Sequence, residues 1–283
     1  MTYSPPGSGG RPAGDDLPAD LNPNPALAQV AADPFGGGYS GAAAVDAHGH
    51  SMVAHQFDDL AQQHEASTLG MWAFLATEIM FFGGALLAYS IYRGNYHYAF
   101  AAASNMELIG VGFFNTLVLL ASSFTVVLAV HHAQHGRNEK VFKWIIITIV
   151  LGCAFIGVKA YEYHHVYAEN LIPGPNFDKQ DLSDPHRHFN GHHFPEHLRR
   201  PAQIFFSFYF ALTGIHALHM VVGVGIMLWV AWLAKKKEFS TDYYNPVEIA
   251  GLYWHFVDIV WIYLYPLLYL VDRTYDVVKA SGH

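Results

Sequence analysis

Hydrophobic residues are concentrated in five long stretches of the chain, at about 69–92, 108–130, 141–163, 204–234 and 249–271. Each stretch has 23 residues or more, and about 20 residues of helix cross the hydrocarbon core of a bilayer. Helices are expected because an open sheet would leave backbone amides unpaired in lipid. The pattern therefore predicts an all-α fold, a polytopic membrane helix bundle with five transmembrane helices.

The segments that flank these stretches are polar and rich in turn-forming residues. Residues 1–66 hold many Gly, Pro and Asp residues and one basic residue, Arg11. That composition cannot bury a core, so we expect a disordered cytoplasmic tail. Residues 67–272 are expected to form the transmembrane domain, with an external loop at 164–203, and residues 273–283 an external tail.

Basic residues in the short loops predict the orientation in the membrane. Arg137, Lys140 and Lys143 follow the second stretch and Lys235–Lys237 end the fourth, whereas the loop after the first stretch offers only Arg93. Cytoplasmic loops carry the excess of Lys and Arg. We therefore expect a cytoplasmic amino terminus and an external carboxyl terminus.

The charge content of the chain excludes several classes of protein. Only 13% of residues are charged, and the formal net charge is −8, which argues against nucleic-acid binding because that needs a basic face. A single cysteine, Cys153, excludes an intrachain disulfide and a CxxC metal site. We expect Cys153 to be a small buried core residue.

Two acids are predicted to lie near the membrane midplane. Glu78 is the tenth residue of the first stretch and Asp258 the tenth of the fifth. A carboxylate there must be protonated, paired or exposed to water, so Glu78 either handles protons or lipid, or is a buried hydrogen-bonded acid. His255 shares a helix face with Asp258, and we expect these two to bond. A midmembrane cluster of all three, joined by His216 or His219, is a further hypothesis.

The other stretches hold polar pairs at helical spacing. His216 and His219 share a face of the fourth stretch, compatible with haem ligation or, through Gly223, with close helix packing. Lys159 and Glu162 lie one turn apart in the third stretch, where a snorkelling salt bridge is expected. Asn115, Thr116, Ser122 and Ser123 form a stripe in the second stretch that predicts hydrogen bonds between helices.

Histidines are also concentrated in the expected external loop, within HRHFNGHHFPEH. The tract resembles metal-binding segments in composition, but it has no fixed ligand spacing. It is either a weak metal site or a solvated loop that packs on another subunit. Its histidines are His186, His188, His192, His193 and His197.

Five motifs, in this order, resemble those of subunit III of haem–copper terminal oxidases. They are GMWAFLATEIMFFGG around Glu78, FFNTLVLLASS, KAYEYHH with Glu162, TGIHALHM and YWHFVDIVW. The resemblance runs from about His64 to Val271. The chain is similar to five-helix bacterial members and lacks the first two helices of the seven-helix form.

The resemblance implies an accessory subunit of a proton-translocating cytochrome c oxidase in the bacterial inner membrane, not catalytic by itself. Haem and copper are then expected only in partner subunits. The implied partners are oxidase subunit I, subunit II, other oxidase subunits and bound phospholipid, and the implied role is support of proton uptake and durability. Glu78 matches the family's membrane-buried glutamate. The residues we associate with protons or lipids are Glu78, Glu162, His216, His219, His255 and Asp258.

Three other functions remain open from the sequence. The chain could serve a quinol oxidase as its subunit III, since the electron donor binds other subunits. It could be the related accessory subunit of nitric oxide reductase. A self-contained membrane cytochrome of the b type would instead use His216, His219 or His255 as axial ligands.

Overall fold

A computed structural model describes residues 53, 56, 57, 59–105, 107–168, 171–174, 177, 196–241 and 243–271. Every element of regular secondary structure within these residues is a helix, which confirms the predicted all-α class. Five of the helices in the described ranges are long and apolar enough to cross a membrane, as predicted. The helices are α2 (Leu60–Asn95), α3 (His97–Ser104), α4 (Ile109–Gln134), α5 (Asn138–Ala168), α6 (Glu196–Lys235) and α7 (Asn245–Tyr269).

Several helices extend beyond the hydrophobic stretches that predicted them. α2 begins at Leu60, so residues 60–66, which the sequence places in the tail, are helical. The side chain of Asp59 caps this helix by accepting a hydrogen bond of 2.7 Å from the Gln62 amide, as an N-cap residue does. α5 and α6 likewise extend into the expected loop at 164–203. Polar residues can continue a helix once it leaves the hydrocarbon, so hydropathy underestimates helix length.

The short helix α3 was not predicted from the sequence. It has eight residues, HYAFAAAS, too few to span a membrane, and a hydropathy search for spans overlooks it. Ala99 to Ser104 are nevertheless buried. The Ser104 hydroxyl donates a hydrogen bond of 2.8 Å to the Leu268 carbonyl at the end of α7, so α3 closes one end of the bundle.

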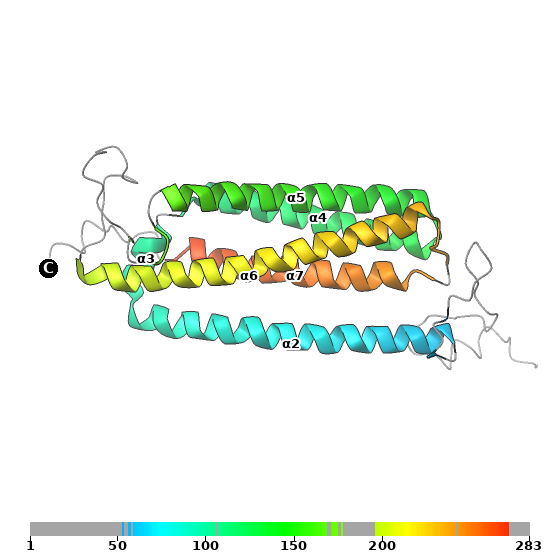
Figure 1. Ribbon diagram of the computed structural model, residues 1–283, viewed down its shortest axis with the longest axis horizontal. Helices are drawn as coiled ribbons and strands as arrows, with labels where there is room; N and C mark the ends of the chain where they lie inside the picture. The colour runs from blue at the N-terminus through cyan, green and yellow to red at the C-terminus, as the bar shows by residue number, and fades with distance from the viewer. Residues whose placement is uncertain are drawn as a thin grey trace, which may run out of the picture. The chain divides into compact units, whose positions relative to one another are not determined.

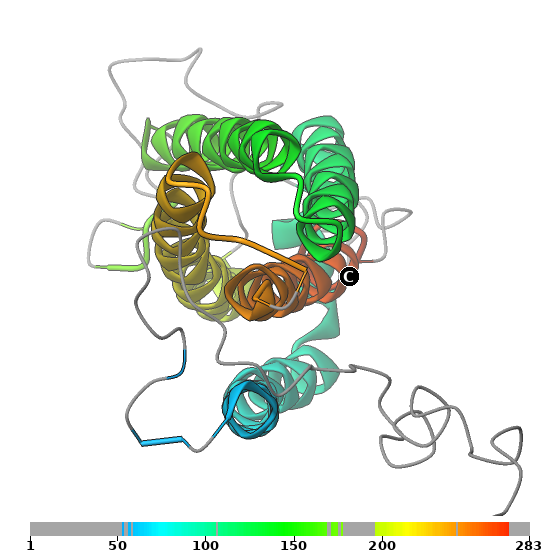
Figure 2. The same ribbon diagram turned by 90° about the vertical axis from the view of Figure 1, so that its right-hand side faces the viewer.

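Helices α4, α5, α6 and α7 pack side by side in a ring, and α2 lies outside it, against α7 and α6 (Figures 1 and 2). Large aromatic side chains fill the ring, including the fully buried Trp254, Trp261 and Phe155. Glycines make room for them: a Cβ atom at Gly152 would lie 2.7 Å from the Trp254 ring, and one at Gly223 would lie 3.1 Å from it. Close helix packing, one of the two alternatives for the Gly223 motif, is what the structure has at this position.

Helix α2 is the least buried of the five spanning helices. In an 18-residue apolar stretch of α2, 11% of the residues are buried, against 33% to 61% in the corresponding stretches of the other four helices. Its buried residues, Leu75, Phe82 and Tyr89, recur every seven positions and form one narrow stripe. Most of α2 therefore depends on lipid or another chain for contact, and polar links to the ring matter for its position.

Candidate functional site

Glu78 of α2 pairs with His219 of α6 in the middle of the bundle. The Glu78 Oε2 atom lies 3.2 Å from the His219 Nε2 atom, and both side chains are largely buried, with 20% and 16% exposed. Aromatic rings enclose the pair: Phe82 lies 5.4 Å and Tyr253 6.5 Å from the imidazole, between centroids. A polar link thus joins α2 to the ring near the middle of α2.

The second nitrogen of His219 constrains where the proton of this pair lies. His219 Nδ1 lies 2.9 Å from the Ile215 carbonyl oxygen, which can only accept, so Nδ1 carries a proton. Nε2 is then either an acceptor from a protonated Glu78 or a donor to its carboxylate. Both arrangements have a net charge of zero and share one proton between the two side chains.

The fifth-span residues His255 and Asp258 face a different neighbour. His255 Nδ1 lies 2.7 Å from the Ser123 hydroxyl of α4. The bond expected between His255 and Asp258 is absent, because neither carboxyl oxygen of Asp258 has a hydrogen-bond partner within the described ranges. The side chain of Asp258 instead lies beside Ser123 of α4, because its direction around the helix axis is not determined by its position along the span. Asp258 is 3% exposed.

The hypothetical single cluster of Glu78, His255 and Asp258 is therefore divided into two groups. Glu78 and His219 join α2 to α6, whereas Ser123 and His255 join α4 to α7. Within the described part of the chain, no hydrogen bond or ion pair links the two groups. His216 joins neither: it is buried between the Phe155 and Trp261 rings, at 5.6 and 5.2 Å.

The polar stripe of α4 makes the interhelical hydrogen bonds that its spacing predicts. Trp254 Nε1 donates to the Ser122 hydroxyl at 2.9 Å, and Trp261 Nε1 donates to the Thr116 hydroxyl at 3.1 Å. Asn115 donates to the Phe155 carbonyl of α5 at 3.5 Å. With the Ser123–His255 bond, all four stripe residues attach α4 to a neighbouring helix.

Lys159 and Glu162 of α5 form the predicted salt bridge, with 3.1 Å between Nζ and Oε2. The expectation that it snorkels is wrong, because the two residues are 4% and 1% exposed. Tyrosine hydroxyls compensate for the lost water: Tyr209 of α6 donates to Glu162 at 2.8 Å, and Lys159 donates to Tyr269 of α7 at 2.8 Å. Sequence reasoning missed both tyrosines, since their partners lie 47 and 110 residues away.

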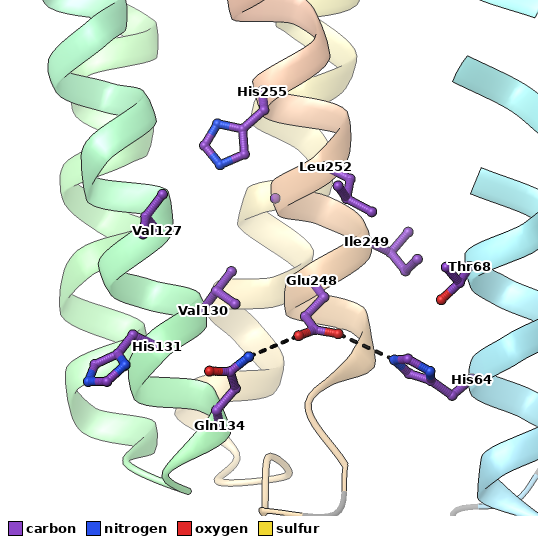
Figure 3. Close-up of a pocket in the computed structure, with 11 residues that line it drawn as sticks. His64, Thr68, Val127, Val130, His131, Gln134, Glu248, Ile249, Leu252 and His255 are labelled. Carbon is purple, nitrogen blue, oxygen red and sulfur yellow. Dashed lines mark hydrogen bonds and ion pairs between the residues drawn. The ribbon is translucent and has the colours of Figure 1, made fainter. Parts of the chain in front are cut away.

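A cavity of about 540 Å³ lies between α2, α4 and α7 (Figure 3). Aliphatic side chains form much of its wall, among them Val127 and Val130 of α4 and Leu252 of α7. His255 lies at its inner end. The volume is within the range of small-molecule sites, about 300–1,000 Å³.

The Glu248 carboxylate joins three helices at the other end of this cavity (Figure 3). Its Oε1 atom accepts a hydrogen bond of 3.1 Å from Gln134 of α4, and its Oε2 atom lies 3.3 Å from His64 Nε2 of α2. Nearby, Asn245 donates to Ser67 of α2 at 2.5 Å. The site is thus an apolar space with a polar end, which suits an amphiphilic ligand.

Two other expectations concern residues away from these groups. Cys153 is exposed rather than buried, because it lies on the outer face of α5; the adjacent Gly152 is the residue that faces the ring. His186, His188, His192 and His193 lie outside the described residues, and only the backbone of His197, in α6, is described. The weak metal hypothesis for this tract stays a prediction.

The fold and the buried polar contacts define a multi-pass membrane protein whose helices are linked by polar side chains inside the bundle, among them Glu78 with His219 and Glu162 with Tyr209. The chain belongs to the cytochrome c oxidase subunit III family, whose profile matches residues 54–169 and 201–272. The cytochrome c oxidase subunit 3 of Thermostichus vulcanus is 30% identical over 217 residues, covering 76% of this chain and 92% of that protein.

Relatives named as quinol oxidase subunits are similar over a comparable length. The probable quinol oxidase subunit 3 of Staphylococcus epidermidis (strain ATCC 35984) is 25% identical over 228 residues, covering 80% of this chain and 99% of the relative. That of Staphylococcus aureus (strain USA300) has the same identity and coverage. The resemblance inferred from the five motifs is therefore confirmed, and the family serves both kinds of oxidase.

Proposed function

We propose that the chain is the accessory, non-redox subunit III of a bacterial haem–copper oxidase, placed in the inner membrane beside subunit I. Oxygen reduction and electron transfer then occur at haem and copper in partner subunits. Family membership supports this assignment. Two of the histidines considered as haem ligands have other partners, which also supports this assignment. His219 pairs with Glu78, and His255 pairs with Ser123.

Within the complex, we propose that the chain retains phospholipid and supports proton uptake by subunit I. The observation that carries the lipid role is the cavity between α2, α4 and α7, apolar along its wall and polar at Glu248. A phospholipid acyl chain matches the wall, and the headgroup matches the polar end. The proton shared by Glu78 and His219 supports a role near a proton route.

A quinol oxidase is the second candidate for the parent complex, because several relatives carry that name. The two candidates differ in the electron donor, which binds partner subunits. Isolation of the complex from its native membrane and identification of the copurifying chains separates them. Haem bands in a reduced-minus-oxidised spectrum of the isolated chain would contradict the accessory role and favour a self-contained cytochrome.

The lipid role is tested by filling the cavity. Leu252→Trp places a large ring in the space that Leu252 lines (Figure 3), and Val150→Trp adds the same ring at an outward-facing position of α5, where Val150 is 60% exposed. We expect the complex with Leu252→Trp to retain less phospholipid after detergent washing and to lose activity after fewer turnovers. Equal retention in both variants and the unmodified complex would refute the proposal.

A further inference from the structure

Six of the fifteen Lys and Arg residues of the chain lie in or beside two connections between helices. Arg137, Lys140 and Lys143 lie at the α4–α5 turn, and Lys235–Lys237 lie at the end of α6. Both connections are at the same end of the ring (Figure 1), and all six side chains are exposed. We call these six residues the basic patch. Its sign is opposite to that of the whole chain, which has a net charge of −8.

The two connections are fastened to each other, so the six residues form one surface. The Asn138 side chain donates to the Phe239 carbonyl at 2.7 Å and accepts from the Phe239 amide at 3.2 Å. Lys237 Nζ lies 3.8 Å from Glu139 Oε1, across the same contact. The patch is therefore built by tertiary structure from segments about a hundred residues apart.

Lys237 occupies a backbone position that usually belongs to glycine. Its φ is +61°, in the left-handed region. The Lys237 amide bonds to Ala234 and the Glu238 amide to Leu233, the Schellman pattern that ends a helix with glycine. A side chain there costs stability, and strain of this kind can mark a position under functional constraint. A lysine at position 237, despite this strain, supports a functional role for the basic patch.

Neighbouring acids do not neutralise the patch. Glu139 pairs with Lys237 at 3.8 Å and Glu238 with Lys236 at 3.9 Å. Glu238 is partly exposed and the other three side chains are exposed, so both pairs are weak. A third acid, Asp242, follows in the sequence. Arg137, Lys140, Lys143 and Lys235 have no ion-pair partner among the described residues. Positive charge therefore remains in excess.

Trp232 indicates the depth of the patch in the membrane. Its ring is 52% exposed at the end of α6, and the Lys236 ammonium lies 3.6 Å from the ring centroid. Exposed tryptophans at the ends of spanning helices lie at headgroup level, and the cation–π contact keeps the ammonium there. The cations are thus placed at the level of lipid phosphates rather than far out in water.

We propose that the basic patch binds the phosphate-bearing headgroups of anionic phospholipids. Clustered cations at the headgroup level match the chemistry of negatively charged lipids, and each contributes to the attraction. The patch shares no residue with the Leu252 cavity and depends neither on the proposed oxidase function nor on the orientation in the membrane. It adds an electrostatic lipid site to the hydrophobic one.

The test compares two pairs of charge removals in the full-length chain. Lys140→Gln with Lys143→Gln removes two cations from the patch, and Arg93→Gln with Arg200→Gln removes two at the opposite end of the helices. Each protein is reconstituted in phosphatidylglycerol and phosphatidylcholine, and the ratio of the two lipids that remain bound is measured by mass spectrometry. We expect the phosphatidylglycerol preference to fall about fivefold for each patch charge removed at low salt.

Two further results are expected, and two others would overturn the proposal. Lys140→Arg with Lys143→Arg keeps the charge and should retain the preference, and high salt should weaken the preference of the unmodified chain. The proposal is overturned if the control pair loses as much preference as the patch pair. It is also overturned if the patch pair leaves the lipid ratio unchanged while its thermal unfolding matches that of the unmodified chain.

Discussion

Glu78 and His219 are 141 residues apart in the sequence and 3.2 Å apart in the structure. The pair lies near the middle of α2, with 18 helical residues before Glu78 and 17 after it. An isolated charge at such a depth costs several kcal/mol. The Glu78–His219 pair avoids that cost because the two side chains together hold one proton and have a net charge of zero. The pair also attaches α2, the least buried spanning helix, to the ring.

Glu78 should react selectively with a hydrophobic carbodiimide. The reagent enters lipid and attacks a protonated carboxyl, and the hydrogen bonding of His219 permits a proton on Glu78. We expect mass spectrometry to find the label on Glu78 in preference to Glu139 and Glu238, which lie at the helix ends. Modification of those two acids with Glu78 untouched would contradict a proton on Glu78 and place the shared proton on His219 instead. Glu78→Ala should leave the five helices folded but loosen α2 from the ring and weaken lipid retention.

The Lys159–Glu162 pair should be much more important for stability than a surface salt bridge. Either Lys159→Met or Glu162→Gln leaves one buried charge without its partner, and such a loss costs about 3–5 kcal/mol. We expect each single variant to unfold at lower temperature in detergent. The double variant should be less destabilised than the sum of the two, and additive losses would show that the pair is not coupled.

Two glycines of α5 should respond in opposite ways to alanine. A Cβ atom at Gly152 meets the Trp254 ring at 2.7 Å, whereas one at Gly157 meets nothing within 4 Å. Gly152→Ala is expected to destabilise the bundle by about 1–3 kcal/mol through overpacking. Gly157→Ala, the matched control, should be neutral or stabilise by up to about 1 kcal/mol. Equal unfolding temperatures for the two variants would contradict the packing around Trp254.

The orientation predicted from the basic loops can be tested by cysteine labelling. The native Cys153 is first replaced by serine, because it is exposed. A membrane-impermeant thiol reagent added from outside should then label Asn190→Cys and spare Glu139→Cys, whose side chain is 88% exposed at the opposite end. Labelling of Glu139→Cys in sealed cells with Asn190→Cys protected would reverse the predicted topology.

Local sequence signals predicted part of the site correctly. Helical spacing identified the Lys159–Glu162 salt bridge and the polar stripe of α4, because residues three, four or seven apart share a helix face. Spacing failed for His255 and Asp258, since Ser123 of another helix offers His255 a competing partner. It also failed for Cys153, where a hydrophobic neighbourhood does not distinguish the lipid-facing side of a helix from the ring side.

The sequence by itself determined the family, the number of spans and the position of Glu78 near the middle of its helix, because hydrophobic length and motif order are properties of the linear chain. Tertiary structure alone decided which polar groups meet. Glu78 lies beside His219, and Glu162 accepts a hydrogen bond from Tyr209. Glu248 contacts both His64 and Gln134. The physical reason is that hydropathy specifies depth in a bilayer but not rotation about a helix axis, which depends on how side chains from different helices pack.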